Sequence, residues 1–316
     1  MKLSTYISTE EKQNVFSTYQ RFNSVGEFDQ WYQSHCKLPY YFRGIKEACY
    51  KNYTSAQRVC ITHDLDCLPS TLVYLQVQKL RKEHGQLFEK YCKAIGIDCS
   101  DFFLMSYAQH YKNGISPLLD VTTDLDTALF FMCNGVQFST NGVDTNSIEN
   151  YASIYFVNKE IPTFDDVINY LIQKVGFPQN ISKEEFIKCA ENSALRIFGA
   201  SLFNLFAALS KYSYFLVDNK QYFCAFNKDE FTYKKALTIG NLNMTAQNGC
   251  FIYYDNDKEP FEEKVVECVD IHKKLIPYIT REILIPKNKT EEYLFPNIDK
   301  IVNDSYEKML ADNKIL

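Results

Sequence analysis

The hexapeptide YYFRGI, residues 40–45, is the stretch that decides how this chain folds. It is short, rich in aromatic residues and preceded by Pro39, which is typical of a β-strand. Arg43 lies within this strand. Because an unpaired buried charge is strongly unfavourable, its guanidinium must be paired or must face a cleft. Gly44 follows, and a strand glycine lets a ligand or another backbone come close. Arg43 is therefore either a ligand-binding residue or the partner of a core carboxylate.

Other strands are predicted at points far from this one along the chain. They are residues 117–122, 151–158, 212–217, 222–226, 250–254 and 278–285. Helical patterns predict helices at residues 24–35, 71–94, 100–111, 124–131, 163–175, 182–210, 261–275 and 298–311. The sequence therefore predicts an α+β fold, with a mixed or antiparallel sheet assembled from distant strands and flanked by helices.

Several of these helices carry more specific expectations. Ser24 is the expected N-cap of the first helix, with Glu27 completing a capping box, and Thr123 followed by Asp126 gives a similar start to the helix at 124–131. The long helix at 71–94 is expected to bury one apolar face, made of Leu72, Leu75, Leu80, Leu87, Phe88 and Tyr91. The last helix has a comparable face, made of Ile298, Ile301, Val302, Met309 and Leu310.

The composition is that of a globular protein and excludes several classes. The chain has 316 residues, with 34 Lys plus Arg against 39 Asp plus Glu, so its net charge of −5 argues against strong nonspecific nucleic-acid binding. No apolar run approaches the length of a membrane span, and the N-terminus lacks a secretory signal, so we expect an intracellular, cytoplasmic protein. The 11 cysteines include no CxxC pair, which argues against a structural zinc site. The abundance of Tyr and Phe beside a single Trp is typical of an AT-rich bacterial genome.

Three places combine polar residues with apolar segments outside the first strand. Gln109 and His110 end an apolar helix face, where a histidine is either a buried structural residue or part of a site. Asp120 and Thr122 lie in the next strand, just before a helix whose free N–H groups at 123–126 are expected to attract a phosphate or carboxylate. Gln247 precedes an Asn-Gly turn and a strand. No GxGxxG, P-loop, GxSxG or HExxH motif occurs, and the carboxylates beside His63 lack the spacing of a metal site.

Five separated blocks of the sequence resemble the FRG domain family, named for its Phe-Arg-Gly signature. They are Tyr41 to Gly44; Leu68-Pro69-Ser70-Thr71-Leu72; Ala108-Gln109-His110-Tyr111 followed by 118–122 and 128–131; Gln247, Gly249 and Phe251; and Ile285-Pro286 followed by 294–299. The family usually has Thr-Arg before its Leu-Leu-Asp, where this chain has Ser116-Pro117. The resemblance implies an FRG domain over residues 24–300 with a helical insertion around 160–210. An N-terminal extension at 1–23 precedes it, and a helical tail at 301–316 follows.

The layout of this family is similar in turn to the ADP-ribosyltransferase fold. By that resemblance Arg43 holds the phosphate or ribose of NAD, Thr122 lies on the second wall of the nicotinamide cleft, and Gln247 contacts the ribose or the acceptor. These three are the expected catalytic residues. Because an amide cannot act as a carboxylate, Gln247 would hydrogen-bond a ribose hydroxyl. The residues expected to bind the nucleotide are Tyr41, Arg43, Gly44, Gln109, His110, Asp120 and Thr122.

The resemblance implies an NAD-consuming ADP-ribosyltransferase or glycohydrolase that acts as an intracellular bacterial toxin or anti-phage effector. NAD would be its substrate and a protein or nucleic acid its acceptor, with neither a metal nor a membrane involved. Two alternatives stay open. The same cleft could belong to a non-enzymatic module that binds a nucleotide or a protein, or Arg43, His110 and Asp120 could form a buried network that only joins distant strands. Convergence of Arg43, His110, Thr122 and Gln247 on one open pocket distinguishes a ligand site from the structural network.

Overall fold

The computed structural model describes residues 2–95, 99, 104, 114–136, 147–158, 214–217, 242–254, 256 and 258–312. The predicted segments 100–111, 163–175, 182–210 and 222–226 fall wholly or almost wholly outside these ranges. Within them, seven strands form one sheet in the order β1-β7-β4-β2-β3-β6-β5. The strands are β1 Tyr19–Phe22, β2 Tyr41–Ile45, β3 Leu118–Thr122, β4 Tyr151–Val157, β5 Tyr214–Val217, β6 Gly249–Tyr254 and β7 Val265–His272. Only β1 and β7 pair in parallel, so the predicted mixed sheet of an α+β fold is confirmed.

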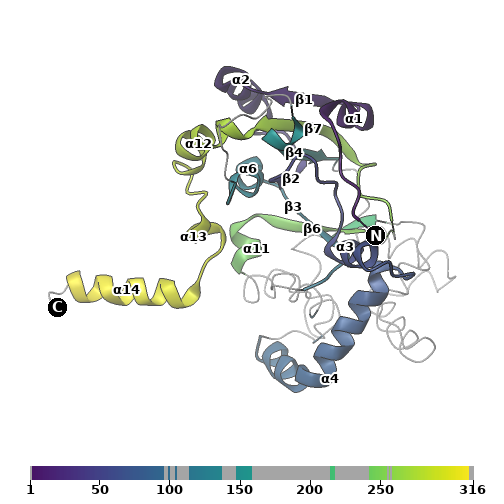
Figure 1. Cartoon of the computed structure of the whole chain (residues 1–316). Helices are drawn as coiled ribbons and strands as arrows, with labels where there is room; N and C mark the ends of the chain where they lie inside the picture. Colours follow the sequence, from purple (N-terminus) through teal and green to yellow (C-terminus); the bar gives the residue numbers. More distant parts are fainter. Residues whose placement is uncertain are drawn as a thin grey trace, which may run out of the picture.

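Helices cover both faces of this sheet and extend beyond it (Figure 1). They are α1 Thr9–Val15, α2 Val25–His35, α3 Ser55–Thr62, α4 Pro69–Ile95, α6 Leu125–Cys133, α11 Leu242–Ala246, α12 Ile276–Ile279, α13 Glu291–Leu294 and α14 Ile298–Asp312. Short 3₁₀ turns occupy Ile148–Asn150 and Lys273–Leu275, and one π-helical turn spans Thr280–Leu284. Ser24 caps α2 as predicted, since its hydroxyl accepts a hydrogen bond from the Glu27 amide.

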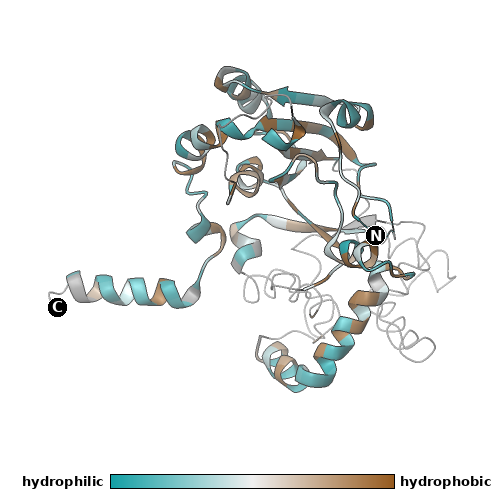
Figure 2. Cartoon of the chain, viewed as in Figure 1, coloured by the Kyte–Doolittle hydropathy of each residue, from teal (hydrophilic) through white to brown (hydrophobic). Residues whose placement is uncertain are grey.

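The core has two layers because the central strand β4 is buried on both faces. Ala152, Ile154 and Phe156 of β4 pack with α2, α6 and α12 on one side. Tyr151, Tyr155 and Val157 pack on the other side, against residues of β3, β6 and the N-terminal segment. Helix α6 is apolar apart from Asp126 and Thr127 near its start, as suits a helix enclosed by the core (Figure 2).

Residues 9–22 lie in the fold as α1 and β1, although the sequence was expected to begin with an extension. Strand β1 forms an edge of the sheet beside β7. Lys12 of α1 is fully buried, and its ammonium lies 2.6 Å from a carboxylate oxygen of Asp270, which is also fully buried. Tyr19 and Ser153 donate to the same carboxylate. This buried polar cluster anchors the N-terminal segment to the sheet.

The two predictions for the segment between 261 and 285 were wrong. A helix was predicted at 261–275, but residues 265–272 form β7, because they insert between β1 and β4 and pair with both. A strand was predicted at 278–285, but this segment is helical. Its buried residues Ile279 and Ile283 recur at helical spacing with Ile276 just before it, and the β-branched side chains obscured that period.

Two predicted helices exist, but their expected apolar faces do not pack as predicted. On α4, Leu75 and Leu87 are 57% and 67% exposed, whereas Val73 and Val77 are buried. Helix α14 projects away from the sheet (Figure 1), and Ile301, Val302 and Met309 on its apolar face are each at least 42% exposed. Periodicity identified both helices, yet what covers a helix face depends on the tertiary arrangement.

Candidate functional site

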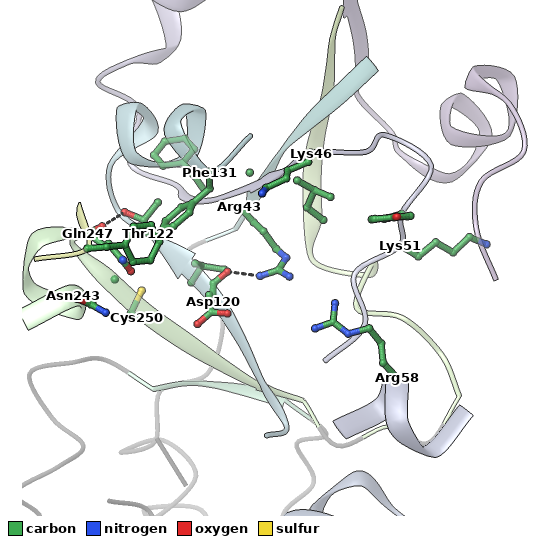
Figure 3. Close-up of a pocket in the computed structure, with 17 residues that line it drawn as sticks. Arg43, Lys46, Lys51, Arg58, Asp120, Thr122, Phe131, Asn243, Gln247 and Cys250 are labelled. Carbon is green, nitrogen blue, oxygen red and sulfur yellow. Dashed lines mark hydrogen bonds between the residues drawn. The ribbon is translucent and has the colours of Figure 1, made fainter. Parts of the chain in front are cut away.

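The sheet is almost split between β2 and β3. One register pair, Phe42 with Thr122, joins these strands, whereas β2 pairs with β4 through five residues and β3 with β6 through five. Beyond the Phe42–Thr122 contact the two strands diverge. A cavity of about 490 Å³ opens there, a size common for small-molecule sites (Figure 3).

Arg43 spans the gap that the diverging strands leave. Its Nη1 donates to the Asp120 carbonyl oxygen at 2.6 Å, and its Nε donates to Asn52 Oδ1 at 3.1 Å. Beyond the Phe42–Thr122 pair, where β2 and β3 no longer bond to each other, the Arg43 guanidinium donates to the β3 carbonyl of Asp120 instead. Burial lowers the pKa of Arg43, and Arg58 lowers it further, whereas the Asp120 carboxylate acts in the opposite direction. An arginine stays protonated at neutral pH despite such effects, so Arg43 brings a fixed positive charge to the cavity.

A second layer of hydrogen bonds fixes the orientation of Arg43. Asn52, which accepts from Arg43, is itself held by Glu262. One Glu262 carboxylate oxygen accepts from the Asn52 backbone amide and the other from the Asn52 side-chain amide, each at 3.2 Å. Burial raises the pKa of Glu262. Glu262 and Asn52 are therefore positioning residues for the guanidinium.

Arg58 faces Arg43 across the cavity (Figure 3). It lies on α3, whose start is fixed by a capping box between Thr54 and Gln57. The Arg58 side chain is exposed, and no hydrogen bond or ion pair joins it to another residue of the described ranges. Although the side chain is exposed, neighbouring groups desolvate part of its guanidinium, which lowers the pKa of Arg58, and the Asp120 carboxylate partly offsets this.

The charge of the cavity lining is strongly asymmetric. Arg43, Lys46, Lys51 and Arg58 line it, whereas Asp120 contributes the one carboxylate found among the described lining residues. Lys46 is exposed, but the ammonium of Lys51 points away from both arginines, toward Glu11 at 3.5 Å (Figure 3). The two guanidinium groups and Lys46 make a site suited to an anion with several oxygen acceptors, such as a phosphate.

Gly44 is required by the close approach of a helix. A Cβ at this position would lie 1.9 Å from the Ala128 carbonyl oxygen of α6. Phe42 points to the same face and packs edge-on against Phe156, at 5.1 Å between ring centroids. Of the two roles open for this glycine, the structure supports contact with another backbone. In the Phe-Arg-Gly triplet, the outer residues pack against the core while Arg43 faces the cavity.

Thr122 and Gln247 both line the cavity, but their polar groups are engaged within the protein. The Thr122 hydroxyl donates to the Gln247 carbonyl oxygen at 2.7 Å and accepts from the Asp124 amide at 3.1 Å. The Gln247 side-chain amide donates to the Leu294 carbonyl oxygen at 2.8 Å. These bonds join β3, the turn that precedes β6 and the end of α13, so both residues support the cavity wall.

The start of α6, where a site for a phosphate or carboxylate was expected, holds a carboxylate of the protein itself. The N-cap is Asp124, one residue later than the predicted Thr123, and its carboxylate accepts from the Asp126 amide at 3.1 Å. The Lys289 ammonium lies 2.5 Å from the same carboxylate. The helix N-terminus is therefore already occupied by a carboxylate of the protein and its lysine partner. Burial acts to raise the pKa of Asp124, but Lys289 and the local hydrogen bonds outweigh it, so the pKa is lowered.

The other predicted residues are distributed unevenly. Arg43, Gly44, Asp120, Thr122 and Gln247 converge on the cavity, whereas Tyr41 is not among the residues lining it. Gln109 and His110 lie outside the described ranges. Their expected place beside Arg43 stays a prediction.

Sequence reasoning missed Arg58 and Lys46. A signal for Arg58 existed in the sequence, because Thr54-Ser55-Ala56-Gln57 has the capping-box pattern that starts a helix carrying this arginine. Lys46 directly follows the β2 strand and had no comparable signal.

A protein-family model matches part of the chain. Residues 38–140 match the model of the FRG domain family, a range that includes Arg43, Arg58, Asp120 and Thr122 but not Gln247. No curated protein and no solved structure matches the chain. No helix within the described ranges combines the length and apolar character needed to cross a bilayer. Nor do the described residues include a group of three or more His, Cys, Asp or Glu side chains that could hold a metal ion.

Proposed function

We propose, from the premise that this chain carries an FRG domain at residues 38–140, that its cavity binds NAD and that the protein is an ADP-ribosyltransferase-like, NAD-consuming enzyme. The observation that carries the proposal is that two arginines, Arg43 and Arg58, face the same cavity at the split of the sheet. Two guanidinium groups from separate elements suit a pyrophosphate, whose two phosphates offer several acceptor oxygens.

The arrangement around the arginines supports binding of a nucleotide rather than of a simple anion. Phe131 and Phe295 line the cavity together with Thr122 and Cys250, so an apolar surface adjoins the charged groups. A ligand with a phosphate and an apolar ring would use both parts. Because Arg58 is exposed and has no partner in the described ranges, it can bind a ligand without breaking an existing contact.

We assign the chemical step to the Asp120 side of the cavity. Consumption of NAD breaks the bond between ribose C1′ and the nicotinamide nitrogen, and the bonding electrons leave with nicotinamide. Positive charge develops on the ribose, and water or another acceptor then adds to C1′ and loses a proton. A carboxylate stabilises such a charge, and Asp120 supplies the one found in the described lining. This assignment replaces the expected part of Gln247, whose amide is bonded to Leu294.

A second function, nucleotide binding without turnover, is favoured by a specific observation. The family resemblance places Thr122 and Gln247 in catalytic positions, but the polar groups of both side chains form hydrogen bonds within the protein. The two functions differ in the effect of Asp120→Asn. In an enzyme this variant keeps NAD affinity but loses nicotinamide release, whereas in a binding module there is no release to lose.

The test measures NAD affinity by calorimetry and nicotinamide release by chromatography. Arg58→Gln should weaken NAD binding about tenfold or more, because a charge-assisted bond to phosphate contributes roughly 1.5–3 kcal/mol. Asp120→Asn should slow nicotinamide release by about 10²–10³-fold, the usual effect of removing one preorganised electrostatic group. Lys79→Gln, on an exposed part of α4, is the matched control for loss of one cation and should change neither quantity. Unchanged NAD affinity in Arg58→Gln would overturn the site, and no release by the wild type in the presence of cell lysate would overturn the enzyme.

The proposed cellular role is that of an intracellular toxin or anti-phage effector, which follows from NAD consumption. Expression of the wild-type chain in a bacterial host should lower cellular NAD and slow growth. Arg58→Gln should restore both, while Lys79→Gln should behave as wild type. Growth arrest without a fall in NAD would contradict this role.

A further inference from the structure

A second cavity, of about 700 Å³, adjoins the first. Both cavities are lined by Tyr50, Lys51 and Arg58, so these three residues form their common boundary. The rest of the second lining comes from the N-terminal segment and from two residues near α3, namely Lys2, Leu3, Ser4, Thr5, Tyr53 and Thr62. The N-terminal segment therefore forms part of the wall of this chamber.

The N-terminal wall is held by several independent contacts. Thr5 forms a β-bridge with Tyr50, and the Tyr6 amide donates to the Cys49 carbonyl oxygen at 2.8 Å. The Ser4 hydroxyl lies 2.6 Å from the Tyr53 hydroxyl. Further along the chain, the buried Lys12–Asp270 pair fixes α1 to the sheet. A wall attached at these points is a built part of the fold.

The chemistry of this chamber matches one half of a dinucleotide. Lys2 and Arg58 contribute positive charge, the Lys51 ammonium is 3.5 Å from a Glu11 carboxylate oxygen, and no Asp or Glu is among the described residues that line the chamber. Of the other six lining residues, Leu3, Tyr50 and Tyr53 are apolar or aromatic, whereas Ser4, Thr5 and Thr62 carry hydroxyls. The half-exposed ring of Tyr50 is one on which a base can stack. Arg58, shared by both cavities, lies where a ligand would cross from one to the other.

We propose that the second chamber holds the purine nucleoside of a dinucleotide whose pyrophosphate lies at Arg58 and Arg43. The other nucleoside then lies in the first cavity, beside Asp120. The ligand class is thus a two-part nucleotide, and the N-terminal segment is part of its binding site. The proposal rests on the proposed function for the identity of NAD, but it makes a separate claim about which chamber recognises which half.

The test fills the second chamber and compares three probes. Thr62 is exposed and lines only this chamber, so Thr62→Trp should place an indole where the purine would lie. Calorimetry with NAD and ADP-ribose, which carry adenosine, should show affinities weaker by about tenfold or more, the scale of a lost base-stacking contact. Nicotinamide mononucleotide, which lacks adenosine, should bind Thr62→Trp as tightly as it binds the wild type. Ser4→Trp, in the N-terminal part of the lining, should reproduce this selectivity.

Leu65→Trp is the control for a new surface indole near α3. Leu65 is 41% exposed and lines neither cavity, so all three probes should bind this variant as they bind the wild type. Unchanged NAD affinity in both Thr62→Trp and Ser4→Trp would overturn the proposal, as would an equal loss for nicotinamide mononucleotide.

The two proposals fail in different ways. If the indole variants lost affinity only for the adenosine-containing probes and the wild type released no nicotinamide, the proposed enzyme activity would be wrong and the adenosine chamber would be supported. If the wild type released nicotinamide and the two indole variants bound NAD with unaltered affinity, the enzyme activity would be supported and the adenosine chamber would be wrong. If the wild type bound none of the three probes, both would fall.

Discussion

Replacing Gly44 by alanine tests how β2, α6 and the cavity depend on one another. The new Cβ would lie 1.9 Å from the Ala128 carbonyl oxygen and 2.9 Å from the Met132 amide nitrogen. Ordinary contact begins at 3.4 Å, so the helix and the strand must separate by 3.4 − 1.9 = 1.5 Å. Both neighbouring atoms belong to the backbone, which cannot rotate away as a side chain can.

The cost of that separation follows from how α6 is packed. Ala128, Leu129 and Met132 are fully buried, so a shift of the helix loosens contacts along its whole inner face. A gap of about 0.5–1 Å already forfeits a quarter to a half of a dispersion contact. Overpacked cores lose about 1–3 kcal/mol and occasionally more. Because here both strain and lost contacts act, we expect Gly44→Ala to lower the free energy of unfolding by about 3 kcal/mol or more.

Urea denaturation monitored by circular dichroism measures this loss. Gly85→Ala is the matched control, because it makes the same chemical change inside α4 with no heavy atom within 4 Å of the added Cβ. Alanine is the better helix former, so the control should be more stable than the wild type by about 0.5–1 kcal/mol. If the free energy of unfolding of Gly44→Ala lay within about 0.5 kcal/mol of the wild-type value, the steric explanation for this glycine would be wrong.

Three further perturbations probe the buried polar groups. Lys12→Met should cost about 3–5 kcal/mol of stability in a denaturation experiment, because it leaves Asp270 charged and unpaired, and adding Asp270→Leu should recover much of the loss. Burial raises the folded-state pKa of Glu262 above its ordinary value of 4.5. The stabilising contribution of Glu262 to the free energy of unfolding is therefore fully present below pH 4.5 and is lost as the pH rises through the folded-state pKa. The unfolding free energy of Glu262→Gln minus that of the wild type should therefore increase from pH 4.5 upward and then level off, and a flat difference would contradict the raised pKa. Arg43→Lys should weaken binding of NAD about tenfold in calorimetry, because one ammonium cannot replace the guanidinium that bonds both Asn52 and the Asp120 carbonyl, and full affinity in this variant would show that charge alone suffices.

Local sequence patterns were sufficient for the elements around the cavity. The strand at 41–45, the β3–α6 unit, the Ser24 cap and the long helix at 69–95 were each predicted within a few residues. These features depend on short-range chemistry, such as capping side chains and apolar periodicity, which is present in the sequence itself. The same patterns could not distinguish β7 from a helix, because a strand buried between two others shows no clear alternation.

The sequence by itself determined that Arg43 needs partners, since a charge in an aromatic strand cannot be left unpaired. It also marked Asp120, Thr122 and Gln247 as polar residues beside buried strands. Only the tertiary structure decided that Arg43 bonds a β3 carbonyl 77 residues away, that Arg58 faces it, and that Gly44 admits α6 rather than a ligand. The physical reason is that β2 and β3 meet at one residue pair and then diverge. Strand divergence arises from the packing of the whole sheet, so no local stretch of sequence encodes it.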